Sequence, residues 1–119
     1  MIQAETRLQL SIMRWWAYAH HAYKVDERTL FHCPNGGKRG KVEACIMKGM
    51  GVRAGVPDLL AIVARNGYHG LAIELKSCNG TISPNQTAML ALFEAQGWKT
   101  AICFSFDEAI KAIDSYLKL

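Results

Sequence analysis

The stretch PDLLAIVARNGYHGLAIELK, residues 57–76, predicts a β-hairpin, and this hairpin decides the fold. A short apolar run over residues 59–64 leads to Asn66-Gly67, a residue pair that strongly favours a tight turn between antiparallel strands. In the second strand, residues 71–76, the side chains alternate between the two faces. Glu74 and Lys76 therefore share one face, about 7 Å apart along the strand.

The length of the turn determines on which face of the hairpin Asp58 lies, because paired residues of an antiparallel hairpin share a face. A three-residue loop would pair Arg65 with His69, so that the residue numbers of each pair add up to 134 and Asp58 lies opposite Lys76. A strict two-residue loop would put Asp58 on the other face unless a bulge intervenes. We expect the three-residue loop or a bulge, either of which brings Asp58 to the face of Glu74.

The rest of the chain predicts helices and one further strand around this hairpin. Helices are indicated where apolar residues recur at three- and four-residue steps, or where a serine cap opens an apolar run. The predicted elements are helices over residues 3–21 and 42–50, a helix opened by residues 83–86, a strand over residues 100–104 and a closing helix after residues 105–108. This order predicts one α/β domain over residues 1–119, with a mixed β-sheet flanked by helices.

Composition and charge exclude several classes of protein. The chain has 119 residues, of which half are hydrophobic and a fifth are charged, as in an ordinary globular domain. It contains no apolar run of the roughly 18 residues that a membrane span needs, and its first residues lack the pattern of a signal peptide. The cysteines show no C-x-x-C spacing, so we expect reduced thiols in a soluble cytoplasmic protein. The net charge of +4 favours polyanionic partners such as DNA.

Asp58 and Glu74 are candidate metal ligands. Two carboxylates at one edge of a sheet supply the hard oxygen atoms that Mg²⁺ or Mn²⁺ prefers, and the main-chain carbonyl of Leu75 could add a third. Such an ion polarises a phosphate and lowers the pKa of a bound water, while Lys76 could orient that water or offset developing charge. The plain alternative is a solvent-facing ion pair without function. The Gly/Pro-rich segment before Asp58 and the predicted hairpin favour the metal site over this alternative.

Four segments together resemble the VRR-NUC (virus-type replication-repair nuclease) family of the PD-(D/E)xK nuclease superfamily. They are GVRAGVPDL at residues 51–59, IELK at residues 73–76, SPNQ at residues 83–86 and FHCPNGG at residues 31–37. The resemblance covers nearly the whole chain. It implies a restriction-endonuclease-like fold and a Mg²⁺- or Mn²⁺-dependent DNA endonuclease. It also implies a homodimer, of the kind that phages or bacteria encode, that cleaves branched DNA such as four-way junctions.

The resemblance also implies roles for individual residues. Asp58 and Glu74 would be metal ligands and Lys76 the catalytic lysine. Gln86 would be an additional motif residue near the scissile phosphate, and Glu5 would complete the site from the N-terminal helix. Gln86 could equally serve to complete the capping box that Ser83 opens.

Further residues are candidates for contact with DNA. Cationic side chains near the site could grip phosphates, and a solvated loop without function is the alternative. His32 could bind phosphate or hold the loop that follows it. The DNA-binding candidates are Lys38, Arg39, Lys41, Arg53, His32 and Asn35. Two rival functions stay open, namely a non-catalytic nucleic-acid-binding module of the same fold and a hydrolase of small phosphoesters.

Overall fold

The computed structural model describes residues 2–34 and 40–118 of the chain. The helices are α1 (Ala4–Tyr23), α2 (Lys41–Gly49), α3 (Pro84–Ala95) and α4 (Phe106–Leu117), and a 3-10 turn η1 (Glu27–Thr29) follows α1. The strands are β1 (Leu30–His32), β2 (Leu59–Ala61), β3 (Leu71–Leu75) and β4 (Lys99–Cys103). In this part of the chain, no helix has the length and apolar character that crossing a membrane requires.

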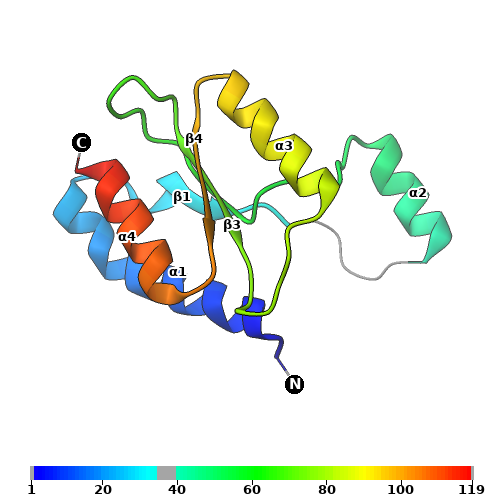
Figure 1. Ribbon diagram of the computed structural model, residues 1–119, viewed down its shortest axis with the longest axis horizontal. Coiled ribbons are helices and arrows are strands. Elements are labelled where there is room, and N and C mark those ends of the chain that lie inside the picture. Colours follow the sequence, from blue (N-terminus) through cyan, green and yellow to red (C-terminus); the bar gives the residue numbers. More distant parts are fainter. Residues whose placement is uncertain (1, 35–39, 119) are drawn as a thin grey trace.

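The strands form one mixed sheet in the order β1-β2-β3-β4. β1, β2 and β3 pair antiparallel, and β3 pairs parallel with β4 after the chain has crossed over through α3. Helices α1 and α4 cover one face of the sheet and α3 covers the other, whereas α2 stands apart at one end (Figure 1). The predicted α/β architecture with a mixed sheet is therefore confirmed.

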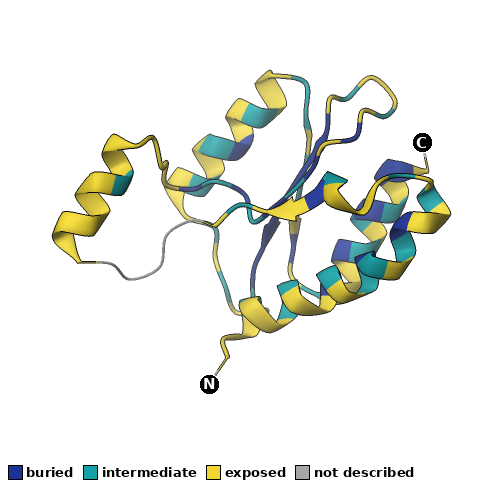
Figure 2. Cartoon of the chain, turned by 180° about the vertical axis from the view of Figure 1, so that it is seen from behind, coloured by how far each residue is buried: buried dark blue, intermediate teal, exposed yellow. Residues whose placement is uncertain are grey.

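The hydrophobic core lies between the sheet and the pair α1 and α4. Figure 2 shows the buried residues concentrated in the strands and on the inner sides of these two helices, while α2 is exposed along almost its whole length. Each of these helices is also anchored by a side-chain hydrogen bond. Tyr116 Oη of α4 donates to the carbonyl of Val63 at 2.6 Å, and Trp16 Nε1 of α1 donates to the carbonyl of Glu27 at 2.7 Å. The largest core side chains are Trp16, Ile12, Leu30, Leu59, Leu71, Ile73, Leu75 and Ile113.

The turn of the hairpin differs from the three-residue loop that the sequence favoured. Arg65 pairs with Tyr68 around a two-residue Asn66-Gly67 turn in which both φ angles are positive, at 49° and 85°. The predicted sum of 134 is wrong, because Ala61 lies opposite Leu71 and the sum within the strands is 132.

A bulge explains why Asp58 and Glu74 share one face of the sheet in spite of the two-residue turn. Three residues separate Ala61 from Arg65, whereas two separate Tyr68 from Leu71, so the first strand carries one extra residue. The register then brings Asp58 level with Glu74, rather than with Lys76, and on the same face. The alternative expectation of a bulge is confirmed.

Gly55 fixes the segment that leads into Asp58. Its φ is +84°, and a Cβ atom there would lie 2.4 Å from the carbonyl oxygen of Asn85 and 2.8 Å from the nitrogen of Gln86. Only glycine allows the connector to pack so closely against the beginning of α3. The packing ties the approach to Asp58 to the helix that carries Gln86.

Gly55→Ala should destabilise the protein more than Gly51→Ala does. Both glycines have a positive φ, but a Cβ at Gly51 would meet nothing within 4 Å. Both substitutions therefore incur backbone strain of about 1–2 kcal/mol, and only Gly55→Ala adds a steric clash of about 1–3 kcal/mol. The free energies of unfolding from denaturant titrations measure the difference. Equal losses in the two variants would show that the contact with α3 contributes nothing.

Candidate active site

A polar cleft of about 240 Å³ lies where the N-terminal part of α1 meets the ends of the central strands. It is lined by Glu5, Thr6 and Gln9 of α1 with its N-cap Gln3, by His32 of β1 and Leu75 of β3, and by Asp58 directly before β2. Four of these residues were site candidates in the sequence. Gln3, Thr6 and Gln9 were missed, although Gln9 lies one helical turn after Glu5 and so had to share its face.

Asp58 is held in place by backbone groups of two other strands. Its Oδ2 accepts a hydrogen bond from the Leu75 N–H at 2.7 Å. Its main-chain carbonyl accepts from the Cys33 N–H at 3.1 Å and lies 2.7 Å from His32 Nδ1. Because the N–H and C=O of one strand residue point to the same edge, the carbonyl of Leu75 also faces the Asp58 side.

Glu74 is a buried carboxylate with one oxygen unpartnered. The residue is 2% exposed; Oε1 accepts from Gln86 Nε2 at 2.9 Å, and Oε2 has no donor among residues 2–34 and 40–118. The pKa of Glu74 is raised to about 8, mainly by burial and next by the neighbouring Asp58 carboxylate, through repulsion and a shared proton, while the charge of Lys76 lowers it. A cation beside Oε2 would relieve both the burial cost and the repulsion.

Gln86 completes the capping box, as one of its two expected roles required, and it also contacts Glu74. Its Oε1 accepts from the Ser83 N–H at 2.9 Å while its own N–H donates to Ser83 Oγ at 3.2 Å, which completes the capping box of α3. Its Nε2 is then free to donate to Glu74. One amide side chain therefore links the beginning of α3 to the buried carboxylate.

Lys76 and Glu5 complete the surroundings of Glu74. Lys76 directly follows β3, is 9% exposed and lowers the pKa of Glu74 through its charge. Among the described residues its ammonium group has no hydrogen-bond or ion-pair partner. Glu5 Oε2 accepts weakly from the Ser77 N–H at 3.4 Å, which connects α1 to the segment after β3.

The donor set fits a hydrated divalent cation better than a fully protein-enclosed one. Residues 2–34 and 40–118 contain no group of three or more His, Cys, Asp or Glu side chains arranged to hold a metal ion. The available oxygens are those of Asp58 and Glu74 and the carbonyl of Leu75. Mg²⁺ commonly binds through one or two carboxylates and keeps several waters, so this sparse set, with its unpartnered buried oxygen, fits that ion.

The DNA-binding candidates other than His32 either do not line the cleft or fall outside the described residues. Lys41 begins α2 and Arg53 lies in the connector after it; both are exposed, and neither lines the cleft. The candidates Asn35, Lys38 and Arg39 lie outside the described residues. Of the three candidates that the structure describes, His32 lines the cleft.

Comparisons with known proteins agree on one family. A family model described as VRR-NUC domain matches residues 3–107. The chain is also similar to a solved structure of a VRR_NUC domain protein, with a TM-score of 0.81 and 28% sequence identity over 100% of this chain and 92% of that chain. No curated protein matches the chain.

Glu74→Gln should stabilise the metal-free protein at alkaline pH. The pKa of Glu74 is raised from 4.5 to about 8 in the fold, so the folded state holds this proton more tightly than the unfolded state does. The wild-type protein therefore loses stability as the pH rises between those values, and the variant, which cannot ionise there, escapes this loss.

Thermal unfolding in EDTA measures this effect. The variant should melt several degrees above the wild type near pH 9 and approach it near pH 5, since about 1 kcal/mol moves the Tm of such a domain by roughly 4 °C. Glu94→Gln, on the exposed side of α3, controls for the loss of one negative charge. Parallel pH profiles for Glu74→Gln and the wild type would contradict the role of burial.

Proposed function

The chain belongs to the VRR-NUC domain family, a family of nuclease-type modules that act on nucleic acids, and we propose that it is a metal-dependent DNA endonuclease. The proposed reaction is hydrolysis of phosphodiester bonds in branched DNA such as four-way junctions, with Mg²⁺ or Mn²⁺ as cofactor. The observation that carries the proposal is the buried, unpartnered Oε2 of Glu74 beside Asp58.

The candidate residues in and beside the cleft have distinct parts in this proposal. A divalent cation, held by Asp58, Glu74 and the carbonyl of Leu75, supplies polarisation of the scissile phosphate and acidification of a bound water. The Gln86 amide fixes Oε1 of Glu74 and so keeps Oε2 directed away from α3. The ammonium group of Lys76, on the same strand face, stabilises the charge that develops on the phosphate as the water attacks.

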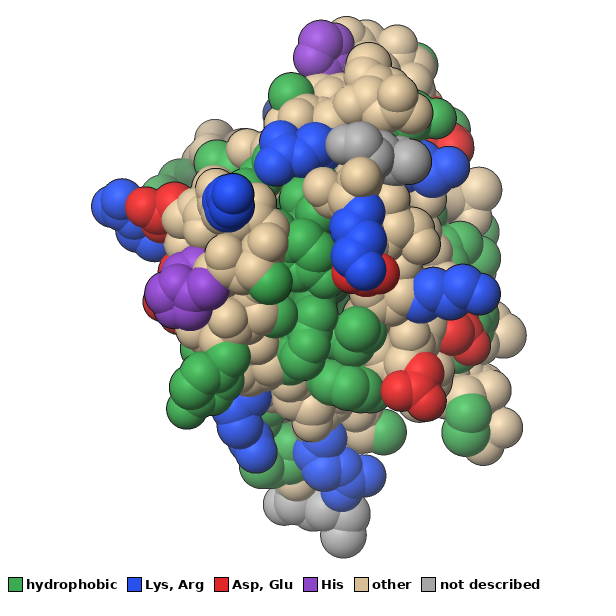
Figure 3. Space-filling view, turned by 90° about the vertical axis from the view of Figure 1, so that its left-hand side faces the viewer, with side chains coloured by type: hydrophobic (Ala, Val, Ile, Leu, Met, Phe, Trp, Pro, Cys, Tyr) green, Lys and Arg blue, Asp and Glu red, His purple; other side chains and the backbone are tan. Residues whose placement is uncertain are grey.

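The charge distribution supports approach of DNA from the side of the cleft and α2. Lys41 and Arg53 are exposed on and beside α2, and the chain carries a net charge of +4. At the opposite end of the molecule, basic side chains are spread around an apolar band and interspersed with acidic ones (Figure 3). Phosphate contacts near the cleft would supply most of the affinity.

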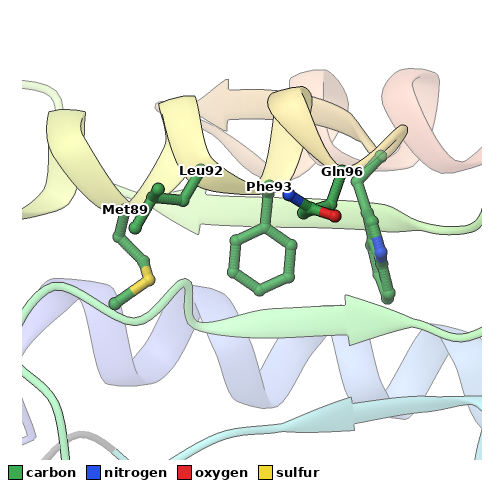
Figure 4. Close-up of a pocket in the computed structure, with 5 residues that line it drawn as sticks. Met89, Leu92, Phe93 and Gln96 are labelled. Carbon is green, nitrogen blue, oxygen red and sulfur yellow. The ribbon is translucent and has the colours of Figure 1, made fainter.

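A two-fold homodimer is part of the proposal, and α3 is the surface that supports it. The helix contains no Lys or Arg and exposes small and apolar residues on its outer side, namely Ala88, Ala91, Leu92 and Ala95. Beside Leu92 lies a hollow of about 230 Å³ lined also by Met89, Phe93, Gln96 and Trp98 (Figure 4). An exposed apolar patch of this kind marks a contact with another protein, and DNA would require cations here. We infer that the α3 helices of two copies face each other.

Asp58→Asn and Lys76→Met should abolish cleavage and leave DNA binding largely unchanged. Loss of a metal ligand or of the ammonium group removes several kcal/mol of transition-state stabilisation, which corresponds to a rate at least about 10³-fold lower. The rates are measured on a four-way junction, a flap, a duplex and a single strand, each with Mg²⁺, Mn²⁺ or EDTA.

Exposed substitutions elsewhere control for this experiment. Asp107→Asn and Lys111→Met remove the same charges from exposed positions of α4 and should cut at the wild-type rate. A wild-type protein that binds DNA and never cuts with either metal would overturn the proposal in favour of a non-catalytic binding module. Cleavage of a model nucleotide ester without competition from DNA would instead indicate a small-phosphoester hydrolase.

Leu92→Glu should convert the homodimer into monomers. The side chain of Leu92 is 60% exposed on α3, and a carboxylate there would have to be desolvated in the interface. Leu10→Glu on α1, where Leu10 is 47% exposed, is the matched control and should stay dimeric. Light scattering after gel filtration at several concentrations measures the mass. A monomeric wild type, or a dimeric Leu92→Glu, would contradict this interface.

A further inference from the structure

His32 is bonded to the main chain of a proposed metal ligand. Strand β1 pairs with β2 so that His32 lies opposite Leu59, next to Asp58. His32 Nδ1 is 2.7 Å from the carbonyl oxygen of Asp58. A carbonyl can only accept a hydrogen bond, so Nδ1 carries the proton and Nε2 of the neutral ring is an acceptor.

The bond does more than satisfy the carbonyl of Asp58. That carbonyl already accepts from the Cys33 N–H at 3.1 Å, so its hydrogen-bonding need is met without the imidazole. What the additional bond determines is the orientation and the tautomer of the ring. His32 is exposed and lines the same cleft as Asp58, and among the described residues its Nε2 has no partner.

Because Nε2 of the neutral His32 ring is a hydrogen-bond acceptor, it can bind only groups that donate a hydrogen. Phosphate oxygens carry no hydrogen and cannot donate to a neutral Nε2, whereas a water molecule can. The ammonium group of Lys76 has three donors and no acceptor, so it cannot receive a hydrogen bond from that water. The imidazole of His32, which is anchored at the edge of the cleft, supplies the hydrogen-bond acceptor that Lys76 lacks.

We propose that His32 is a positioning residue that acts through both ring nitrogens. Its Nδ1–H holds the main chain of Asp58 and thereby the metal-binding carboxylate, and its Nε2 accepts a hydrogen bond from the water that attacks the phosphate. The second half of this proposal rests on the proposed function, whereas the first half concerns the folded protein alone.

Cation binding tests the first half without any cleavage. His32→Ala should weaken Mn²⁺ binding to the DNA-free protein roughly 10- to 100-fold, as loss of a partner behind a metal ligand usually does. His32→Asn should restore the affinity to within about threefold, because the Asn amide places an N–H close to the position of Nδ1–H. His21→Ala, at an exposed position of α1, should bind as the wild type does. Isothermal titration calorimetry measures the affinities.

Nitrogen NMR of the metal-free protein gives a second readout of the same half. The long-range ¹H–¹⁵N spectrum should show His32 as the tautomer with the proton on Nδ1. A wild-type Mn²⁺ affinity in His32→Ala, or the opposite tautomer, would overturn the anchoring of Asp58.

Cleavage at saturating Mn²⁺ tests the second half. His32→Asn keeps the anchor and lacks Nε2, so it should cut a four-way junction at least about tenfold more slowly than the wild type. A wild-type rate in His32→Asn would overturn the role of Nε2. If the wild type itself never cuts, the proposed function fails and the Nε2 half fails with it, while the affinity series still decides the anchoring half.

Discussion

The burial of Glu74 next to Asp58 is the constraint on which the rest of this structure depends. Two carboxylates in a low-dielectric setting repel each other, and the pKa of Glu74 near 8 reflects how strongly the fold resists their simultaneous ionisation. The protein gives each of them one donor, the Leu75 N–H for Asp58 and the Gln86 amide for Glu74. In the part of the chain that the structure describes, Oε2 of Glu74 has no donor, which is costly in a protein interior unless a ligand compensates for it.

Three elements that are distant in sequence maintain this arrangement. Strand β1 holds the carbonyl of Asp58, Gln86 in the first turn of α3 holds Glu74, and α1 closes the cleft and reaches the segment after β3 through Glu5. The site therefore lies at the edge of the sheet, where the ends of the strands meet the N-terminus of α3 and one side of α1 (Figure 1). Such a site is built on rigid elements, which favours precise placement of reacting groups.

Local patterns in the sequence predict the parts of this structure that short-range geometry controls. Alternation in β3 places Glu74 and Lys76 on one face, and Asn66-Gly67 identifies the turn. The bulge could not be placed, because it arises where residue 62 leaves the hairpin and donates its N–H to the carbonyl of Thr29 in a third segment. Strand β1 has three residues, too few for a visible alternation. The double role of Gln86 likewise depends on how α3 is docked, which the capping pattern alone does not reveal.

The extra residue in the first strand of the hairpin also restricts how this part of the gene can change length. Side chains in a strand alternate with a period of two, so the loss or gain of one codon between Ala61 and Leu71 would exchange the inward and outward sets of one strand and separate Asp58 from Glu74. Changes of two codons preserve the phase. Natural length variation in this hairpin should therefore occur in even steps, or in odd steps that gain or lose a bulge, wherever the acidic pair is retained.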